Sequence, residues 1–303
     1  MHIYIVGPTA SGKTALAIEL ASHLSTEIIS ADSRQCYKHM DIGTAKPSAK
    51  ELSTITHYNI SLFEPDYKDN AEKFYQRTNH WLAQSKQSDC IFCGGSTLYI
   101  QTLLFPLDNI PPSDQAIHQD LMNELSLNGI QPLYQELVQS DPHYAKQMDG
   151  MNTQRILRAL NIIRQTKQPF SSFHQRSNFV LPSNSIVFAL TWERDTLNKR
   201  ISDRVEVMIE SGLVDEVRHL TQLGYDENTY AMNTVGYKEG LLYLKGAISL
   251  TEMKELIIVN TRRYAKRQLT WFKRYPFLHW INLNEVASPH QRIKDLIHEH
   301  SIA

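Results

Sequence analysis

The chain begins with a pattern whose residue types and spacing bind phosphate. Residues 7–14 read GPTASGKT, which fits G-x-x-x-x-G-K-[ST], and they lie between the apolar run Ile3–Val6 and the helix-forming run Ala15–Leu20. In a strand–loop–helix setting, backbone N–H groups and the positive end of the helix dipole face phosphate oxygens. Lys13 is then placed as a point charge on terminal phosphates, and Thr14 as a Mg²⁺ ligand. We therefore expect the chain to bind a di- or triphosphate.

A carboxylate follows the second apolar run, where it would face the same ligand. Asp32 comes shortly after Glu27–Ser30, and the carboxyl end of a parallel strand beside a phosphate-binding loop borders the ligand crevice. Asp32 could bind Mg²⁺ through water, act as a general base, or cap the next helix. The residues alone leave these three alternatives open.

The third apolar run, Cys90–Cys93, ends in Gly94-Gly95-Ser96 rather than in a carboxylate. Nucleotide hydrolases usually place a Mg²⁺-binding carboxylate at such a strand end, so this ending disfavours a motor ATPase. Glycines there would let a backbone or a flat substrate approach closely. Cys90 and Cys93 have C-x-x-C spacing, but residues three apart on a strand face opposite sides. We interpret them as buried hydrophobic residues rather than as a redox pair or a zinc site.

The distribution of charge indicates a polyanionic partner. The 303 residues carry a net charge of −1, yet residues 151–192 and 256–284 contain no Asp or Glu and several Lys and Arg. The second stretch falls on a helix that we expect to begin at Ser249, with Glu252 completing a capping box. Its basic positions 262, 263, 266, 267, 273 and 274 lie opposite the apolar positions Ile257, Tyr264 and Trp271. We favour a helix that contacts nucleic-acid phosphates over a solvated charged face.

The order of the elements predicts an α/β fold. Short β-like runs alternate with helical patterns, which is typical of a parallel sheet with helices on both faces. After the three runs above, the fourth and fifth are Ile186–Thr191 and His279–Leu283. More than ninety residues separate the third and fourth runs, too many for one crossover. We expect a P-loop nucleotide-kinase-like core formed by residues 1–105 and 186–303, and a mostly helical insertion at 106–185. Helical patterns in the insertion occur at Ala116–Ser126, Gln131–Gln139 and Gln154–Arg164. No stretch is long and apolar enough to span a membrane, and no signal or transit peptide is apparent, so we expect a cytoplasmic protein.

Eight sequence blocks, distributed over nearly the whole chain, resemble tRNA dimethylallyltransferases (tRNA isopentenyltransferases). The blocks are GPTASGKT at 7–14, SADSRQ at 30–35, MDIGTAKP at 40–47, GGSTLY at 94–99, QRxxRAL at 154–160, RxxxR at 200–204, VGYK at 235–238 and TRRYAKRQ at 261–268. The resemblance implies transfer of a dimethylallyl group from its diphosphate to N6 of the adenosine just 3′ of the anticodon. It also implies a kinase-like core, and a helical insertion that clamps the anticodon stem-loop of the tRNA partner.

Matched by position, the resemblance implies roles for individual residues. The diphosphate would be held by Gly7, Pro8, Thr9, Ala10, Ser11, Gly12, Lys13, Thr14, Arg200 and Arg204. The catalytic group would comprise Thr9, Lys13, Asp32 as the base, and Arg204. Mg²⁺ would be bound by Thr14 and Asp32. Contacts with tRNA would come from Asp32, Ser33, Arg34, Gln35, Ser96, His118, Gln154, Arg155, Arg158, Asn233, Thr234, Val235, Gly236, Tyr237, Lys238, Thr261, Arg262, Arg263, Lys266, Arg267 and Gln268. We expect a monomer.

Three segments depart from the family pattern. Thr56–Ile60 replaces a His-His segment, Ser96-Thr97 stands where Thr-Gly is commoner, and His118 replaces an expected Arg. Two other functions also fit a phosphate-binding loop. A nucleoside or nucleotide kinase would need an arginine-bearing lid and a second nucleotide site, and a non-catalytic RNA-binding protein would not need Asp32 beside the loop.

Overall fold

The structure is a computed structural model that describes residues 1–302 except 86–88, 106–107, 149 and 175–180. It divides into two compact units: Met1–Phe105 with Leu181–Ala303, and Pro106–Val180. The predicted insertion, 106–185, ends five residues further along the chain than the second unit does. The difference arises because the residues after Val180 lead into a strand of the first unit, which begins at Ser185.

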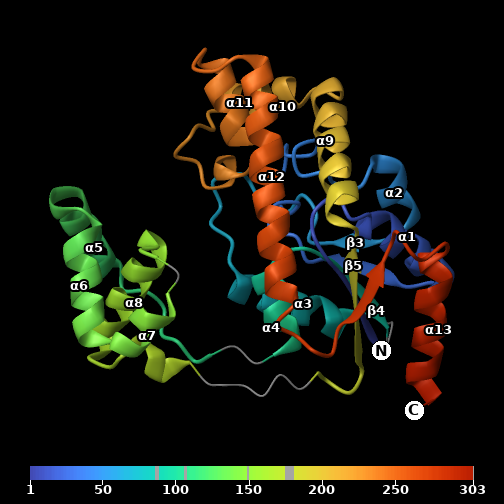
Figure 1. Cartoon of the computed structure of the whole chain (residues 1–303), viewed down its shortest axis with the longest axis horizontal. Coiled ribbons are helices and arrows are strands. Elements are labelled where there is room, and N and C mark those ends of the chain that lie inside the picture. The colour runs from blue at the N-terminus through green and yellow to red at the C-terminus, as the bar shows by residue number, and fades with distance from the viewer. Residues whose placement is uncertain (86–88, 106–107, 149, 175–180, 303) are drawn as a thin grey trace. The chain divides into compact units, whose positions relative to one another are not determined.

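A single six-stranded parallel sheet forms the centre of the first unit (Figure 1), with the order β3-β2-β4-β1-β5-β6. Its strands are β1 His2–Val6, β2 Glu27–Ser30, β3 His57–Tyr58, β4 Cys90–Gly94, β5 Ser185–Thr191 and β6 His279–Asn282. Five of these follow the apolar runs in the sequence. Strand β3 was not predicted, because two residues are too few to show a period. The predicted parallel sheet is confirmed.

Alternate residues of the strands supply two hydrophobic layers, one on each face of the sheet. Ile3 and Ile5 pack with Leu16 and Leu20 of α1 (Lys13–Leu24) and with α13 (Pro289–Ile302). Tyr4 and Val6 pack on the opposite face with α3 (Ala71–Gln84), α4 (Thr97–Leu104) and the C-terminal end of α12 (Leu250–Phe272). Cys90 belongs to this second layer and Cys93 to the first, so they face opposite sides as predicted.

Four helices form a lobe above the carboxyl edge of the sheet: α9 Arg194–Glu210, α10 Leu213–Gln222, α11 Tyr237–Leu244 and α12 (Figure 1). A hydrophobic cluster that includes Val205, Val217, Leu241 and Ile257 joins them to the loop after β2. The short helix α2 (Ala49–Thr54) follows that loop. The capping box predicted at Ser249 is present at the start of α12. Within the described residues, no helix is both long and apolar enough to cross a membrane.

The second unit is helical, with its own core. It contains α5 Gln115–Asn128, α6 Ile130–Ser140, α7 Pro142–Gln147, α8 Thr153–Thr166 and a 3₁₀ turn at Phe170–Phe173. Leu121, Leu133, Leu137 and Leu160 are fully or almost fully buried between the helices. The predicted helices 116–126, 131–139 and 154–164 correspond to α5, α6 and α8. Helix α7 has only six residues, and the signal for it is Pro142 at its first position.

Candidate active site

The phosphate-binding loop connects β1 to α1, as the sequence pattern predicts. Helix α1 begins at Lys13, and the side chain of Lys13 folds back over the loop. Its Nζ donates to the carbonyl of Pro8 at 2.6 Å and lies 3.5 Å from Oγ of Ser11. The ammonium group therefore stands where the loop and the helix N-terminus would meet an anion, and the local field there favours negative charge.

Three side chains from the C-terminal half of the chain fasten the loop. Gln268 accepts a hydrogen bond from the N–H of Thr9 at 2.8 Å, and Trp192 and Arg200 donate to loop carbonyls at 3.1 and 2.9 Å. The guanidinium of Arg200 also lies 4.6 Å from the ring centre of Trp192. Arg200 thus holds the loop in shape. The sequence predicted a contact of Arg200 with diphosphate but did not indicate this positioning role.

A cavity of about 420 Å³ opens at the loop and collects the predicted catalytic residues. Thr9, Lys13, Asp32 and Arg204 line it together, although they come from the loop, from α1, from the end of β2 and from α9. Among the described residues that line it, Asp32 is the one acidic side chain. The basic ones are Lys13, Arg34, Arg204, Lys238 and Arg267. The cavity is therefore electropositive and suited to an anionic ligand.

The pKa values of two cations in the cavity are lowered, as expected where positive side chains outnumber negative ones. Removal from water lowers the pKa of Lys13 to about 8, and repulsion from Arg204 adds to this, while Cys93 and Asp32 act in the opposite direction. Desolvation likewise lowers the pKa of Arg204, opposed by Asp32. Two desolvated cations that share one carboxylate are stabilised by a bound anion that carries more than one negative charge.

Asp32 belongs to a turn directly after β2 rather than to a helix cap. Its Oδ1 accepts a hydrogen bond from the backbone N–H of Arg34 at 2.8 Å. The turn is tied to the start of α4, because Oγ of Ser96 accepts from the N–H of Ser33 at 2.8 Å and donates to Oγ of Ser33 at 3.0 Å. In the described part of the chain, no hydrogen bond occupies Oδ2 of Asp32. That oxygen is free to accept a proton from a ligand in the cavity.

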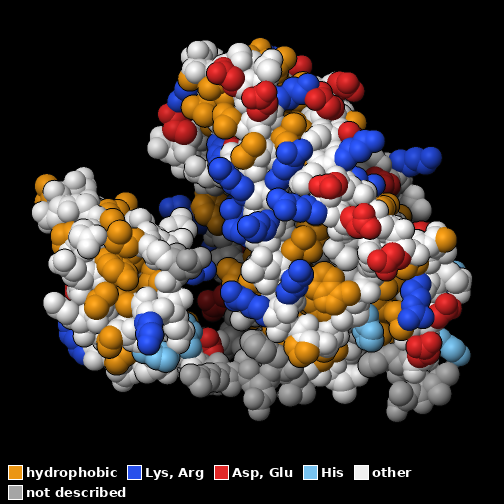
Figure 2. Space-filling model, in the orientation of Figure 1, with side chains coloured by type: hydrophobic (Ala, Val, Ile, Leu, Met, Phe, Trp, Pro, Cys, Tyr) orange, Lys and Arg blue, Asp and Glu red, His pale blue; other side chains and the backbone are white. Residues whose placement is uncertain are grey.

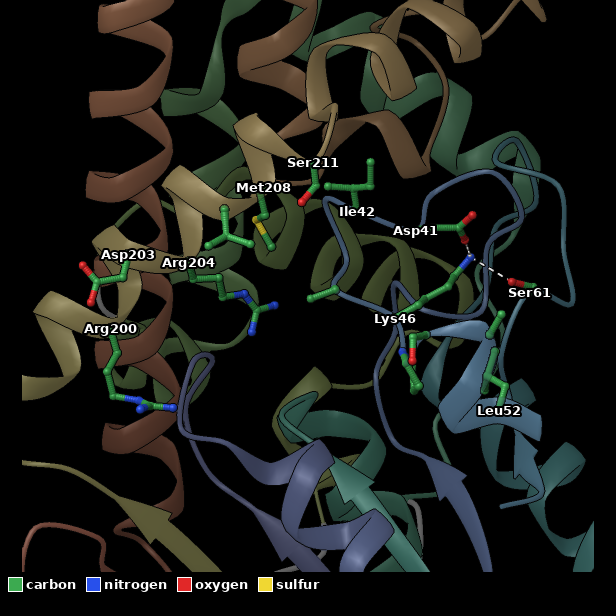
Figure 3. Close-up of a pocket in the computed structure, with 15 residues that line it drawn as sticks. Asp41, Ile42, Lys46, Leu52, Ser61, Arg200, Asp203, Arg204, Met208 and Ser211 are labelled. Carbon is green, nitrogen blue, oxygen red and sulfur yellow. Dashed lines mark hydrogen bonds and ion pairs between the residues drawn. The ribbon is translucent and has the colours of Figure 1, made fainter. Parts of the chain in front are cut away.

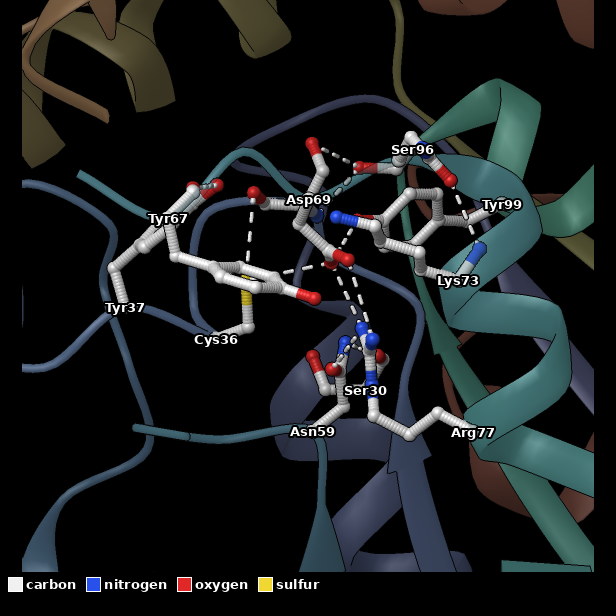
Figure 4. A network of polar contacts seen from close by, with 12 residues as sticks. Ser30, Cys36, Tyr37, Asn59, Tyr67, Asp69, Lys73, Arg77, Ser96 and Tyr99 are labelled. Carbon is white, nitrogen blue, oxygen red and sulfur yellow. Dashed lines mark hydrogen bonds and ion pairs between the residues drawn. The ribbon is translucent and has the colours of Figure 1, made fainter. Parts of the chain in front are cut away.

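A buried polar network beneath this turn holds it in place (Figure 4). Asp69 is 5% exposed and receives hydrogen bonds from Arg77 at 2.8 and 3.2 Å and from the hydroxyl of Tyr99 at 2.6 Å. Arg77 also donates to Asn59 at 2.9 Å, and Asn59 donates to the carbonyl of Ser30, the last residue of β2, at 2.8 Å. The network therefore links α3 and α4 to the strand end that carries Asp32.

The glycines at the end of β4 allow close contacts within the protein, and both also line the cavity. A Cβ on Gly94 would lie 2.1 Å from the carbonyl oxygen of Ala31, and one on Gly95 would lie 2.3 Å from Nε2 of Gln268. Such distances are below any van der Waals contact. The glycines thus bring β4 against the strand end before Asp32, and let Gln268 donate to the carbonyl of Gly95 at 2.8 Å.

The MDIGTAKP block at 40–47 is a scaffold for the cavity wall. The carboxylate of Glu216 accepts hydrogen bonds from the backbone N–H groups of Asp41, Ile42 and Gly43, at 2.8, 2.7 and 3.1 Å. It also accepts one from the hydroxyl of Tyr237 at 2.6 Å. This is a correction for Tyr237, which we predicted to contact tRNA. Its side chain is 0% exposed and fixes this block through Glu216.

Residues predicted to contact tRNA occur around the cavity and on the exposed face of α12. Ser33, Arg34, Gln35, Asn233, Thr234, Val235, Gly236, Lys238, Thr261, Arg267 and Gln268 line the cavity. Arg34 has a buried NH1 atom without a hydrogen-bond partner among the described residues, which leaves that donor available to a ligand. Gln268 also has a structural role, because both ends of its amide are bonded to the protein, at Thr9 and Gly95.

Six basic side chains, four in the second half of α12 and two directly after the helix, form an exposed strip (Figure 2). Arg262, Arg263, Lys266, Arg267, Lys273 and Arg274 are all exposed. Arg262 donates to Oγ of Ser202 at 3.0 Å, but none of the six forms an ion pair within the described residues. The absence of acidic partners there confirms that the strip is a surface of one charge, as the sequence predicts. We call these six residues the α12 strip.

The second unit carries the other predicted tRNA contacts. His118 on α5 and Gln154 and Arg155 on α8 are exposed. Arg158 differs from them, since its guanidinium donates to the carbonyl of Pro111 at 2.8 Å and also contacts Ser113, so it ties α8 to the segment before α5. Its role within the unit is structural, beside any contact with RNA.

Sequence reasoning overlooked two kinds of residue in the cavity. Tyr264 was assigned to the apolar side of α12, but it is 36% exposed and lines the cavity with Asp32. Ile201, Val205, Met208 and Ile257 supply an apolar part of the lining. The period of an amphipathic helix does not separate a residue packed in the core from one that lines a cavity beside it. Nothing in the sequence marked these positions.

The residues predicted to hold Mg²⁺ fit a site in which the protein supplies only some of the ligands and the substrate and water supply the others. Thr14 and Asp32 both line the cavity and offer a hydroxyl and a carboxylate oxygen. The described residues contain no group of three or more His, Cys, Asp or Glu side chains that could hold a metal ion. Mg²⁺ commonly takes one or two protein ligands, substrate phosphate oxygens and water. The donor set here fits that mode.

The fold and the site together define a class: an α/β protein with a P-loop sequence at the end of its first strand, an electropositive cavity there and a carboxylate beside it. Comparisons with known proteins place it more narrowly. The IPP transferase family model matches residues 35–275. A tRNA dimethylallyltransferase of Acetivibrio thermocellus is 41% identical over 298 residues, which cover 97% of this chain and 95% of that protein. The chain therefore belongs to the IPP transferase family.

Solved structures agree with this assignment. A tRNA delta(2)-isopentenylpyrophosphate transferase from Staphylococcus epidermidis is 35% identical, with a TM-score of 0.72 and 98% of each chain covered. A eukaryotic dimethylallyltransferase acting on tRNA is 25% identical, with a TM-score of 0.81, and the match covers 98% of this chain and 79% of that one. The fold of the whole chain is thus that of this family.

Proposed function

We propose that this chain transfers a dimethylallyl group from dimethylallyl diphosphate to N6 of the adenosine just 3′ of the anticodon in tRNA. The observation that carries the proposal is the shared cavity, in which the phosphate-binding loop, Arg204 and Asp32 meet residues of the basic helix α12. A diphosphate donor fits the two desolvated cations, and an RNA acceptor fits the α12 strip. The assignment of the chain to the IPP transferase family supports both halves.

The diphosphate end of the donor would lie on the loop between Lys13 and Arg204. When the allylic C–O bond breaks, its electron pair leaves with the diphosphate, so negative charge grows on the group that these cations face. Fixed donors aimed at a developing charge stabilise the transition state more than the ground state. Thr9 lines the same part of the cavity, and its N–H is held by Gln268 at 2.8 Å.

Asp32 would take the proton that the acceptor loses. As N6 of adenine forms its bond to the allylic carbon, one N–H proton must leave, and the free Oδ2 of Asp32 would accept it. The base must leave its stack to reach the cavity. The ring of Tyr264 at the cavity wall offers a surface on which an extruded base can stack.

We also propose that Mg²⁺ accompanies the donor. Thr14 would bind it directly and Asp32 through water, and the remaining ligands would be diphosphate oxygens and water. The ion would supply further positive charge at the leaving group.

The α12 strip gives a testable prediction about tRNA binding. Replacing Arg263 and Arg267 with alanine should weaken tRNA binding. It should also reduce the slope of log K against log[salt] by roughly 0.9 for each lost contact to duplex-like stem. Binding of dimethylallyl diphosphate should hardly change, because Lys13 and Arg204 carry that site. Filter binding of tRNA at three salt concentrations measures the effect.

A matched control removes the same charge elsewhere. Arg292 and Lys294 lie on α13, which packs against α1 on the other side of the sheet from the end of α12 (Figure 1). Their double alanine variant should bind tRNA with the wild-type slope. Equal slopes for the two double variants would show that the α12 strip is ordinary solvated surface.

One incubation separates the proposal from its rival, a nucleoside or nucleotide kinase. Labelled dimethylallyl diphosphate and bulk tRNA should give label in the tRNA fraction, whereas γ-labelled ATP with nucleosides, nucleotides or tRNA should give none. Label transferred only from ATP would reject the transferase. The identity of the relatives, which are dimethylallyltransferases, supports the first outcome.

A further inference from the structure

Two cavities meet along helix α9, and only a few side chains separate them. The inner cavity of about 420 Å³ contains the site described above. The outer cavity of about 810 Å³ lies between α9 and the segment from Asp41 to Leu52 (Figure 3). Four residues line both: Ala45, Pro47, Arg204 and Met208. These four therefore form the wall between the cavities.

Met208 is the only long apolar side chain in this wall. Ala45 and Pro47 are small or rigid, and Arg204 faces the diphosphate position. In Figure 3, Arg204 and Met208 both project from α9 into the cavity space. They are four residues apart, so they share one face of the helix and lie about 6 Å apart along its axis. That spacing is comparable with the length of one five-carbon isoprenoid unit.

The lining of the inner cavity gives the donor's tail a path toward Met208. Ile201 and Val205, on the same helix, line the inner cavity and not the outer one. A diphosphate at Arg204 therefore places the allylic tail against an apolar surface that ends at Met208. Beyond this residue the outer cavity begins, and it is roomy enough for additional carbons.

We propose that Met208 sets the length of the prenyl donor. Its side chain closes the inner cavity beyond a five-carbon group, and it excludes the second isoprenoid unit of a longer allylic diphosphate from the outer cavity. This inference rests on the proposed transfer of a dimethylallyl group and specifies the donor selectivity of the same site.

The test compares two donors with one tRNA. The measured quantity is the ratio of kcat/KM for geranyl diphosphate to kcat/KM for dimethylallyl diphosphate, which does not depend on the fraction of active enzyme. In Met208→Ala this ratio should rise at least about tenfold. Tenfold is the lower end of the range by which one methylene group changes the discrimination between two substrates in an apolar pocket. Mass spectrometry of the digested tRNA should show a geranylated adenosine.

Two control variants test whether the bulk of the side chain at position 208, rather than any nearby change, determines the ratio. Met208→Leu keeps most of the bulk and should keep the wild-type ratio. Val207→Ala changes the adjacent residue, which is 58% exposed and lines only the outer cavity, so its ratio should also stay at the wild-type value. Should Met208→Ala fold poorly, Met208→Val removes less of the side chain and must still raise the ratio.

The outcomes distinguish this inference from the proposed function. A wild-type enzyme that transfers dimethylallyl, together with an unchanged ratio in Met208→Ala and Met208→Val, overturns the role of Met208 alone. A rise of the same size in Val207→Ala overturns it too, because the wall would not be the determinant. A wild-type enzyme that transfers no dimethylallyl group overturns the proposed function itself.

Discussion

Replacing Asp32 with asparagine is expected to lower kcat on the order of 10²–10⁴-fold, the usual range for loss of a general base. The asparagine keeps the shape of the side chain, and its Oδ1 can still accept the N–H of Arg34, a bond that measures 2.8 Å in the native turn. What is lost is the ability to take a proton from adenine N6. Single-turnover transfer from dimethylallyl diphosphate to tRNA measures the effect.

The turn itself provides the control for this substitution. Ser33 and Ser96 hold the turn independently of the Asp32 carboxylate, so the melting temperature and the affinity for tRNA should stay near the wild-type values. If Asp32 served only to cap the turn, asparagine would replace it well. Transfer at close to the wild-type rate would then refute its role as the base.

Lys13→Ala is expected to reduce transfer by at least about 10²–10³-fold, the effect of removing one donor aimed at a developing charge. Thr14→Ala should act in the same direction. Binding of tRNA should largely persist in both variants, because we expect the α12 strip and other residues that line the cavity to bind the tRNA. A Lys13→Ala enzyme with near-normal kcat would contradict the assignment of the phosphate-binding loop.

The stability of the Lys13 variant is informative as well. The pKa of Lys13 is lowered to about 8 by desolvation, so its charged form is less favourable in the folded chain than in the unfolded one. At neutral pH the protonated lysine therefore costs folding free energy. We expect Lys13→Ala to melt no lower than the wild type in the absence of ligand. Such a variant, inactive but at least as stable, separates loss of function from loss of fold.

Much of the fold could be predicted because its signals are local. The apolar runs that became β1, β2, β4, β5 and β6, and the capping box at Ser249, each depend on a few adjacent residues. The start of the insertion at Pro106 was predicted, whereas its end was placed five residues beyond Val180, because the strand that follows begins only at Ser185. Strand β3 was missed because two residues show no alternation.

The site was predictable only where a motif fixed its geometry. The phosphate-binding loop and Asp32 follow from motif and strand context, and they do line one cavity. The support for that cavity was not predictable, because it depends on contacts between distant segments. Gln268 reaches the loop from α12, Glu216 holds the block at 40–47, and the buried pair Asp69–Arg77 anchors the turn. Tyr237 was predicted to contact tRNA from the family resemblance, and the sequence does not show that its tertiary contacts bury it completely.

The nucleoside made in tRNA tests the central claim most directly. Wild-type enzyme, dimethylallyl diphosphate and a tRNA with adenosine 3′ of its anticodon should be incubated together, digested with nucleases and analysed by mass spectrometry. We predict one N6-(dimethylallyl)adenosine, located just 3′ of the anticodon, and at most about a hundredth of the initial rate of its formation with the Asp32→Asn enzyme. An unmodified tRNA, or a prenyl group on another position or another base, would contradict this prediction.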